Sequence, residues 1–324
     1  MERKLCVILN FLEDRHRAAI AEAAAEGGFV PRFFSEEQLA EAEPWLRESE
    51  VLYAGIPALL RREHPALRWY AFAYAGVDAF CKDNGLWDGK SCLLTNSNTY
   101  DVTLAEHTLL VLLMLLRRMP EYEAIARRRE WRADLPVRSV RDGRFTILGA
   151  GRIGGRIAED LKGMGAAHVT GVSRSGRARS PYFDEVLPMA ELDAVLGRTE
   201  HLICVLPSTA ETRGLFTAEK FALLPRGATF INVGRGDLLD QEALMDALKS
   251  GRLSGAAIDV TVPEPLPPEH PLWDCPGLIL TPHIAGGLTL PRSRDDNVAL
   301  FCENLRRYAA GEALQGLVDK AQGY

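Results

Sequence analysis

The sequence predicts an α/β protein made of two doubly wound parallel-sheet domains. Its 324 residues are enough for two domains of ordinary size, at roughly 150 residues each. Short apolar runs alternate with helical patterns along most of the chain, which is typical of parallel βαβ units. In addition, a glycine-rich turn at 149–154 joins an apolar run to a helical pattern, the arrangement found in dinucleotide-binding sheets. We therefore expect two α/β arrays in succession.

The first array lies in the N-terminal part of the chain. An alanine-rich helical pattern ends at Gly27 and Gly28, and a second helical pattern covers 36–48. The short apolar runs around them are interpreted as the strands of one small domain, at 5–9, 29–34, 51–54, 67–72 and 93–96.

Residues 105–118 form a helical pattern with apolar residues on nearly every face. A helix of this kind must be buried, either between domains or against a second subunit. We expect it to serve as the hinge and as an interface, and we predict a homodimer. A charged segment that contains Trp131 follows it.

The second array begins after Pro136 and has its clearest helical pattern at 241–250. A last helical stretch, around 296–308, could cross back to the first array. The expected strands of the second array are at 145–148, 168–173, 201–207, 228–234, 253–260 and 278–281. The expected domains are a substrate domain of residues 1–100 plus 287–324 and a dinucleotide-binding domain of residues 101–286.

The composition argues against several classes of protein. The formal net charge of −6 leaves no basic excess for binding nucleic acid. The longest apolar run, 109–116, is far shorter than the ~20 residues needed to cross a membrane. The six cysteines and seven histidines show no metal-binding spacing, so we expect no metal site. Most of the cysteines lie in apolar runs, as small buried side chains do, and we expect a soluble cytoplasmic protein.

The glycine-rich turn, Gly149-x-Gly151-x-x-Gly154, is the first candidate functional site. Gly149 would allow a tight turn, Gly151 would let the backbone approach a pyrophosphate, and Gly154 would let the helix lie close to the strand. The phosphates would then lie at a helix N-terminus, where free amides and the macrodipole favour an anion.

Three polar residues follow later strands of the second array: Arg235 in a glycine-rich turn, Glu264 between two prolines, and His283 after a proline. Ligands of such sheets bind at the carboxyl ends of the strands. Each residue alone has an ordinary explanation, as a surface arginine, a solvated glutamate or a structural histidine. His107, in the apolar helix, is interpreted as structural.

Six motifs follow one another in the second array. They are Leu206-Pro-Ser-Thr-Ala-Glu-Thr-Arg-Gly, Ile231-Asn-Val-Gly-Arg-Gly-Asp, Ala257-Ile-Asp-Val, Pro263-Glu-Pro, His270-Pro-Leu-Trp and Leu280-Thr-Pro-His-Ile-Ala-Gly. In this order they resemble the D-isomer-specific 2-hydroxyacid dehydrogenases, most densely between 146 and 287. The resemblance implies a Rossmann dinucleotide domain, a flavodoxin-like substrate domain, and a substrate bound in a cleft whose closure excludes water.

The resemblance also implies roles for the three polar residues. The family residue matched by Arg235 binds the substrate carboxylate and polarises the 2-oxo group, and the one matched by His283 protonates the carbonyl oxygen as hydride reaches carbon. The residue matched by Glu264 pairs with the histidine, fixes its ring and favours its protonated form. A glutamate there disfavours the formate dehydrogenase branch, which carries an amide. The family's substrate loop resembles 74–78, and the substrate-binding residues it implies, besides Arg235, are Ala75, Gly76 and Val77.

The end of the second nucleotide-binding strand indicates the choice of cofactor. An NAD site usually has Asp or Glu there for the ribose hydroxyls, whereas an NADP site needs room and positive charge for the 2′-phosphate. This chain has Ser173 and Arg174, which predict NADPH. The alternative is that Arg174 is an exposed turn residue and that NADH is accepted too. The expected cofactor-binding residues are Gly149, Gly151, Arg152, Ile153, Gly154, Ser173, Arg174, Leu206, Pro207, Thr212, Val233, Gly234, Asp259 and Gly286.

Together with these features, the resemblance implies NADPH-dependent reduction of a small 2-oxo acid to a D-2-hydroxy acid. The NADP-like turn and the Leu116-Arg-Arg-Met119 segment are most similar to the glyoxylate/hydroxypyruvate reductase branch of the family. Two alternatives stay open. The substrate could be a bulkier aromatic or branched 2-oxo acid, or the chain could be a dinucleotide-sensing scaffold like the transcriptional corepressors of the family.

Overall fold

The computed structural model describes residues 2–61, 64–77, 80 and 92–319. The chain divides into two compact units. Unit 1 consists of Met1–Tyr100 and Gly287–Tyr324, and unit 2 consists of Asp101–Gly286. Asp78 of the expected substrate loop and Cys81 lie outside the described residues.

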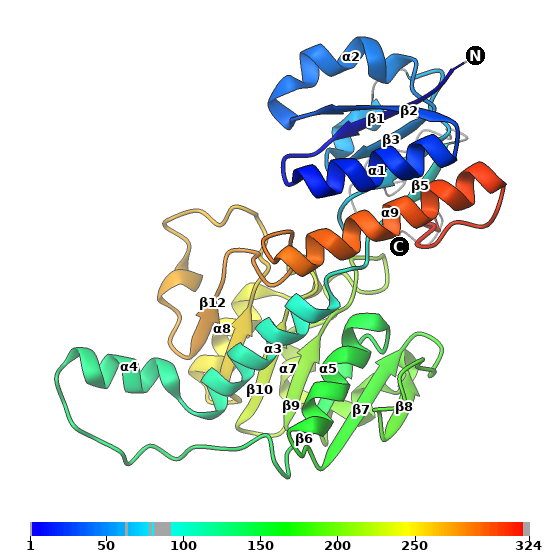
Figure 1. Ribbon diagram of the computed structural model, residues 1–324. Helices are drawn as coiled ribbons and strands as arrows, with labels where there is room; N and C mark the ends of the chain where they lie inside the picture. Colours follow the sequence, from blue (N-terminus) through cyan, green and yellow to red (C-terminus); the bar gives the residue numbers. More distant parts are fainter. Residues whose placement is uncertain (1, 62–63, 78–79, 81–91, 320–324) are drawn as a thin grey trace. The chain divides into compact units, whose positions relative to one another are not determined.

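Unit 1 is built on a sheet of five parallel strands (Figure 1). The order β2-β1-β3-β4-β5 is that of flavodoxin-like sheets, in which the chain winds first to one side of β1 and then to the other. The expected and observed bounds agree to within three residues at each strand end. The strands are β1 (Arg3–Ile8), β2 (Phe29–Phe34), β3 (Val51–Ala54), β4 (Trp69–Phe72) and β5 (Leu93–Thr95).

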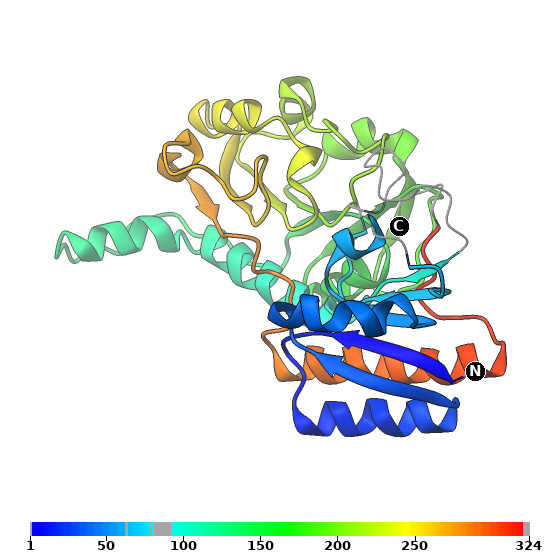
Figure 2. The same cartoon turned by 90° about the horizontal axis from the view of Figure 1, so that it is seen from above.

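Helices cover both faces of this sheet. Helices α1 (Asp14–Glu26) and α9 (Pro291–Ala310) lie side by side on one face, and α2 (Leu39–Arg47) lies on the other (Figure 2). Successive side chains of a strand point to opposite faces, so Leu5 and Val7 pack beneath α1 and α9 while Cys6 and Ile8 pack beneath α2. Two short 3₁₀ helices, η1 (Glu36–Gln38) and η2 (Pro57–Arg61), complete the described elements.

Helix α9 returns to unit 1 from the far end of the chain and is anchored there by Asn297. This side chain is buried, and its amide donates to the carbonyl of Ala73 at 2.7 Å and to Oγ of Ser97 at 2.9 Å. Its oxygen accepts a hydrogen bond from the hydroxyl of Tyr53. The C-terminal helix is therefore part of the core of the N-terminal sheet.

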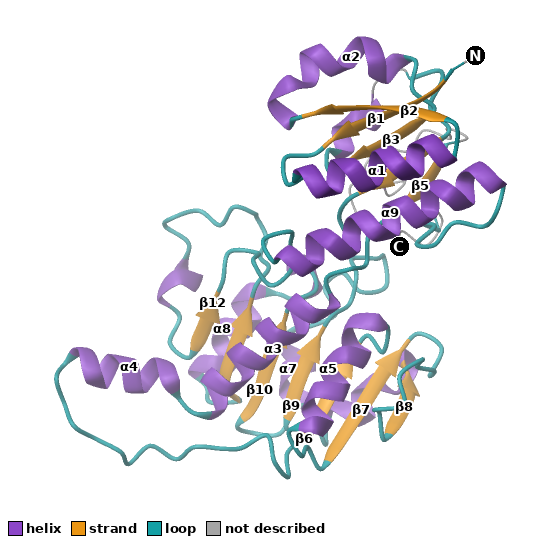
Figure 3. Cartoon of the chain, viewed as in Figure 1, coloured by secondary structure: helices purple, strands orange, loops and turns teal. Residues whose placement is uncertain are grey.

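Unit 2 is built on seven parallel strands in the order β12-β11-β10-β9-β6-β7-β8 (Figure 3). The chain begins at β6, moves outward to β8, returns to β9 and continues to β12, so the direction of winding reverses between β6 and β9. The strands are β6 (Arg144–Leu148), β7 (His168–Ser173), β8 (Glu185–Pro188), β9 (His201–Cys204), β10 (Ala228–Asn232), β11 (Leu253–Ile258) and β12 (Leu278–Leu280).

The two faces of this sheet are also covered. Helices α3 (Asp101–Leu116) and α5 (Arg152–Gly163) pack on one face, and α6 (Leu192–Leu196), α7 (Ala218–Leu223) and α8 (Gln241–Lys249) share an apolar core with the other. Helix α4 (Met119–Arg127) extends away from the sheet (Figures 1 and 2), and the segment after it returns to the sheet, where Arg138 donates to the carbonyl of Gly227 at 3.0 Å. The 3₁₀ helices η5 (Met189–Glu191), η6 (Gly236–Leu238) and η7 (Pro271–Asp274) lie in the loops.

Several details differ from expectation. Helix α3 begins at Asp101 rather than at 105, because an aspartate suits a first helical turn and Asp101 also pairs with Arg152 at 3.1 Å. Strand β8 was not predicted, since it is a half-exposed edge strand without an apolar run. Helix α3 is buried on one side only, leaving Leu110 and Leu113 with 56% and 37% of their surface exposed.

Cys6, Cys92, Cys204 and Cys302 are buried free thiols, as expected for cysteines in apolar runs. Among the residues that the structure describes, no helix is both long enough and apolar enough to cross a bilayer.

Candidate functional site

The candidate residues of unit 2 follow the strands at one edge of its sheet. All seven strands are parallel, so their carboxyl ends lie at the same edge. The glycine turn follows β6, Ser173 ends β7, Arg235 follows β10 and His283 follows β12. The reversal of winding between β6 and β9 is where such sheets bind their ligands.

The three glycines of the turn have distinct environments. Gly149 has a φ of +106°, which side-chain-bearing residues avoid. A Cβ on Gly154 would lie 1.9 Å from the carbonyl oxygen of Gly149, so α5 can approach β6 only with glycine there. A Cβ on Gly151 would meet no atom within 4 Å. Gly151 therefore leaves open space at the N-terminus of α5, and this cradle fits a pyrophosphate.

Two further glycines let the neighbouring loops pack on one another. A Cβ on Gly234 would lie 2.5 Å from the carbonyl oxygen of Leu206, and one on Gly236 would lie 2.3 Å from that of Thr261. The loop after β10 is thus in direct contact with the loops after β9 and β11. This contact brings the Arg235 turn next to the segment that carries Glu264.

The side chain of Asn232, which is fully buried, holds the Arg235 turn through two hydrogen bonds. Its side-chain amide donates to the carbonyl of Arg235 at 2.9 Å, and its side-chain oxygen accepts from the amide of Gly234 at 3.0 Å. The guanidinium of Arg235 also bonds the carbonyl of Gly234 at 2.7 Å. Sequence reasoning did not single out Asn232, although a polar residue at the end of an apolar strand is a usable signal.

The loop that contains Leu206, Pro207 and Thr212 is stabilised by hydrogen bonds between its own residues. Oγ1 of Thr212 donates to the carbonyl of Pro207 at 2.6 Å and accepts from the amide of Thr209 at 2.8 Å. Ser208 ties the loop to the Arg235 turn, because its hydroxyl donates to Asp237 at 2.6 Å.

His283 and Glu264 form an ion pair in which Nδ1 of the histidine lies 2.7 Å from Oε2 of the glutamate. The other carboxylate oxygen accepts a hydrogen bond from the amide of Thr261 at 2.9 Å. Both side chains are partly exposed, at 49% and 37%. A histidine held through Nδ1 in this way presents Nε2 for proton transfer.

The backbone of His283 has a φ of +54°, in the left-handed region. Its amide donates to the carbonyl of Asp259 at 2.8 Å, and the buried carboxylate of Asp259 accepts from the amides of Ile284 and Ala285 at 2.9 and 2.8 Å. These three bonds compensate for an unfavourable backbone conformation. Asp259 thus holds the turn that carries His283.

At the end of β7, the hydroxyl of Ser173 is used within its own turn. It accepts from the amide of Arg177 at 3.0 Å and donates to the carbonyl of the same residue at 2.8 Å. No carboxylate stands at this strand end, and Arg174 and Arg177 are exposed beside it. The turn therefore presents positive charge where an NAD site has an acid.

The expected substrate loop lies in unit 1, after β4. The carbonyl of Ala75 accepts a hydrogen bond from the side chain of Asn96 at 2.8 Å, and Val77 is buried, with 3% of its surface exposed. These contacts give the loop a defined path over Ala75, Gly76 and Val77.

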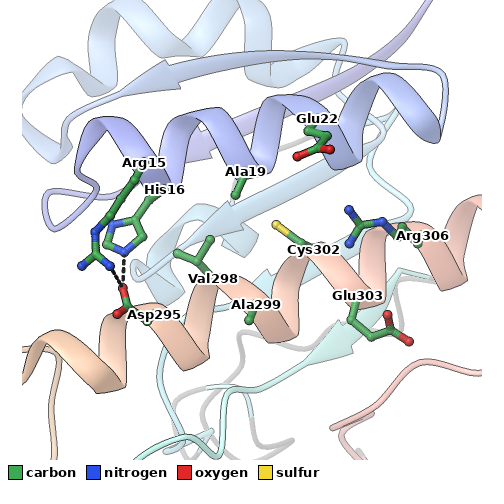
Figure 4. Close-up of a pocket in the computed structure, with 10 residues that line it drawn as sticks. All are labelled: Arg15, His16, Ala19, Glu22, Asp295, Val298, Ala299, Cys302, Glu303 and Arg306. Carbon is green, nitrogen blue, oxygen red and sulfur yellow. Dashed lines mark hydrogen bonds and ion pairs between the residues drawn. The ribbon is translucent and has the colours of Figure 1, made fainter.

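Unit 1 also contains a groove of about 450 Å³ between α1 and α9 (Figure 4). Its floor is formed by small and apolar side chains, including Ala19, Val298 and Cys302. At one end Arg15 and His16 both pair with Asp295, at 2.7 and 2.8 Å. Because these polar groups are occupied by one another, the groove has no evident ligand-binding group at that end.

No group of three or more His, Cys, Asp or Glu side chains in the described residues could hold a metal ion.

The chain is similar to several known proteins. Residues 109–285 match the family model described as "D-isomer specific 2-hydroxyacid dehydrogenase, NAD binding domain". The glyoxylate/hydroxypyruvate reductase A of Serratia proteamaculans is 35% identical over 260 residues, which cover 77% of this chain and 79% of that protein. An uncharacterised protein of Corynebacterium melassecola is 33% identical over 263 residues, covering 80% and 84%.

Solved structures are similar over almost the whole chain. An NADPH-dependent glyoxylate/hydroxypyruvate reductase from Sinorhizobium meliloti, in complex with NADP and sulfate, has a TM-score of 0.83 at 31% identity, covering 99% of this chain and 100% of that one. A D-isomer-specific 2-hydroxyacid dehydrogenase from Xanthobacter autotrophicus, in complex with NADPH and MES, has a TM-score of 0.81 at 30% identity, covering 99% of both chains.

Proposed function

The chain belongs to the D-isomer-specific 2-hydroxyacid dehydrogenase family, and we propose that it is an NADPH-preferring reductase of small 2-oxo acids such as glyoxylate or hydroxypyruvate. Membership confirms the resemblance inferred from the six motifs, and it makes the protein an NAD(P)-dependent oxidoreductase. The observation that carries the proposed reaction is the His283–Glu264 pair beside the Arg235 turn.

In this proposal Arg235 binds the substrate carboxylate and polarises the neighbouring carbonyl, since a planar guanidinium presents several donors in one plane. In unit 1, the substrate-binding residues that we propose are Ala75, Gly76 and Val77, through their backbone amides. Bound NADPH supplies the hydride that is added to the carbonyl carbon. His283 delivers a proton from Nε2 to the carbonyl oxygen, while Glu264 at Nδ1 stabilises the cationic ring that gives up this proton. The ring then regains its proton from solvent.

The preference for NADPH rests on the turn after β7. Arg174 would pair with the 2′-phosphate, and the absence of an acid at Ser173 removes the charge repulsion that an NAD-type strand end would exert. The NADP- and NADPH-bound relatives are consistent with this assignment. The pyrophosphate would lie on the open space at Gly151, next to Arg152 and Ile153.

We also propose that the protein is a homodimer. Leu110 and Leu113 of α3 are exposed in the single chain, and Trp131 in the segment after α4 is 98% exposed. A tryptophan with almost no neighbours in its own chain is unusual, because its apolar surface is large. A second copy of the chain would cover this surface.

The test is NADPH and NADH oxidation with glyoxylate, hydroxypyruvate, pyruvate and phenylpyruvate, with His283→Gln alongside. We expect turnover that is faster with NADPH and with the smaller acids, and a loss of roughly 10²- to 10⁴-fold in kcat in the variant. Turnover of phenylpyruvate alone would redirect the proposal to a bulkier substrate. Cofactor binding without turnover of any acid would contradict the proposed reaction.

A further inference from the structure

A chain of polar side chains runs from the middle of unit 2 to the His283 turn. His107, in the second turn of α3, has only 12% of its side chain exposed. Its Nε2 atom lies 3.3 Å from Oγ1 of Thr281 and 3.9 Å from Oδ1 of Asp259. Thr281 Oγ1 in turn lies 2.6 Å from the same oxygen of Asp259.

The proton positions in this chain follow from the number of donors. The hydroxyl of Thr281 has one proton, and it donates this proton to Asp259. It must therefore accept a hydrogen bond from His107, so Nε2 of His107 carries a proton. Burial lowers the pKa of His107, although the charge of Asp259 opposes the change. A neutral His107 ring with its proton on Nε2 agrees both with the hydrogen bond to Thr281 and with the lowered pKa.

This series of hydrogen-bonded side chains ends at the backbone that carries His283. Oδ1 of Asp259 accepts both from Thr281 and from the amide of Ile284. His283 itself has a left-handed φ of +54°, which a residue with a side chain keeps only when its surroundings fix it. The Asp259 carboxylate is thus held by Thr281 as well as by the amides of Ile284 and Ala285, so the group that holds Thr281 contributes to the orientation of this turn.

We propose that His107 is a positioning residue for His283, acting through Thr281 and Asp259. This inference rests on the proposed reductase function, because it concerns the residue that delivers the proton. The sequence predicts a structural histidine at 107, and this proposal adds a positioning role for it. It fixes the rotamer of Thr281, and with it the carboxylate that holds the amides on the C-terminal side of His283.

Two variants test this role. His107→Leu removes the donor and keeps an apolar side chain of similar size, whereas His107→Gln keeps an N–H at nearly the same reach as Nε2. We expect kcat to fall roughly tenfold in His107→Leu and to stay within about threefold of wild type in His107→Gln, since small misplacements of a reacting group are costly. His168→Gln, at the opposite edge of the sheet, is the matched control and should leave kcat unchanged.

Amide hydrogen exchange of peptides spanning 281–286 gives a second readout that needs no turnover. Exchange should be faster in His107→Leu than in wild type and restored in His107→Gln, with α8 peptides unchanged in both. An unchanged exchange rate in His107→Leu, an unchanged kcat, or an equal loss in both variants together with a lower melting temperature would overturn the inference. If the wild-type protein turns over no 2-oxo acid, the proposed function fails, and exchange alone decides whether His107 holds the turn.

Discussion

Glu264 contacts His283 with one carboxylate oxygen and its own loop with the other. Oε2 lies 2.7 Å from Nδ1 of His283, and Oε1 accepts from the amide of Thr261 at 2.9 Å. The loop after β11 therefore orients the carboxylate independently of its contact with His283. This arrangement explains how a partly exposed ion pair, which would otherwise be weak, can hold one geometry.

We expect Glu264→Gln to lower kcat by about a hundredfold, because an amide cannot stabilise the protonated ring of His283. The neutral side chain can still bond to Thr261, so the loop should keep its path. The measurement is steady-state kinetics with saturating NADPH, and cofactor affinity by fluorescence titration is the control. A kcat within threefold of wild type would remove Glu264 from the proposed mechanism.

The double variant Ser173→Asp with Arg174→Gln should weaken NADPH binding by roughly 10- to 100-fold, the loss typical of a charge-assisted contact, and leave NADH binding unchanged or stronger. An aspartate at 173 can still accept the hydrogen bond from Arg177, so the turn should persist. Dissociation constants for both cofactors decide the matter. An equal loss for NADH and NADPH would show that Arg174 is only a turn residue.

Gly151→Ala and Gly154→Ala form a matched pair with opposite expected outcomes. A methyl group at 151 enters open space, so the variant should fold with a melting temperature close to wild type and bind NADPH at least tenfold more weakly. A methyl group at 154 would overlap the carbonyl of Gly149, so this variant should lose stability. Thermal unfolding and cofactor titration of both proteins test this. Normal NADPH binding by Gly151→Ala would place the pyrophosphate elsewhere.

His201 should make the protein sensitive to acid. Burial lowers the pKa of this histidine from 6.5 to about 4, with a smaller contribution from Arg138. Between these values the unfolded chain binds the proton and the folded chain does not, so stability is complete above pH ~6.5 and falls as the pH approaches ~4. The loss is about 3 kcal/mol for a shift of this size.

Urea unfolding of the wild type and of His201→Gln at neutral and acidic pH measures this loss. The glutamine variant does not titrate here, so its stability should fall less steeply with acid. Parallel pH profiles for the two proteins would contradict the assignment to His201.

A dimer should dissociate when the exposed surface of α3 becomes charged. We expect light scattering to give the mass of a dimer for the wild type and of a monomer for Leu110→Glu with Leu113→Glu, and Trp131→Ser should weaken the dimer. Leu223→Glu on α7, where the side chain is 40% exposed, is the control for an added charge on an exposed leucine. A monomeric wild type at micromolar concentration would refute the proposal.

The sequence predicted most of the strands because a buried parallel strand is a continuous apolar run. Strand β3 has the expected bounds, whereas the edge strand β8 has no such run and was missed. The site was predicted as separate motifs only. Three features of the site depend on loops that meet in space, and no spacing along the chain encodes them. They are the contact of Gly236 with Thr261, the hydrogen bond from Asn232 to the Arg235 turn and the left-handed φ of His283.

The place of α9 in the core of unit 1 has a consequence for synthesis on the ribosome. The sheet of the first hundred residues emerges first, but the face that α9 covers, including Tyr53 and Trp69, stays open until residue 301 and its neighbours have been translated. Unit 2 is contiguous and can fold during that interval. At roughly 5 to 20 residues per second, the nascent N-terminal sheet waits about ten seconds or more for its last helix, and in that time this apolar face is exposed to aggregation.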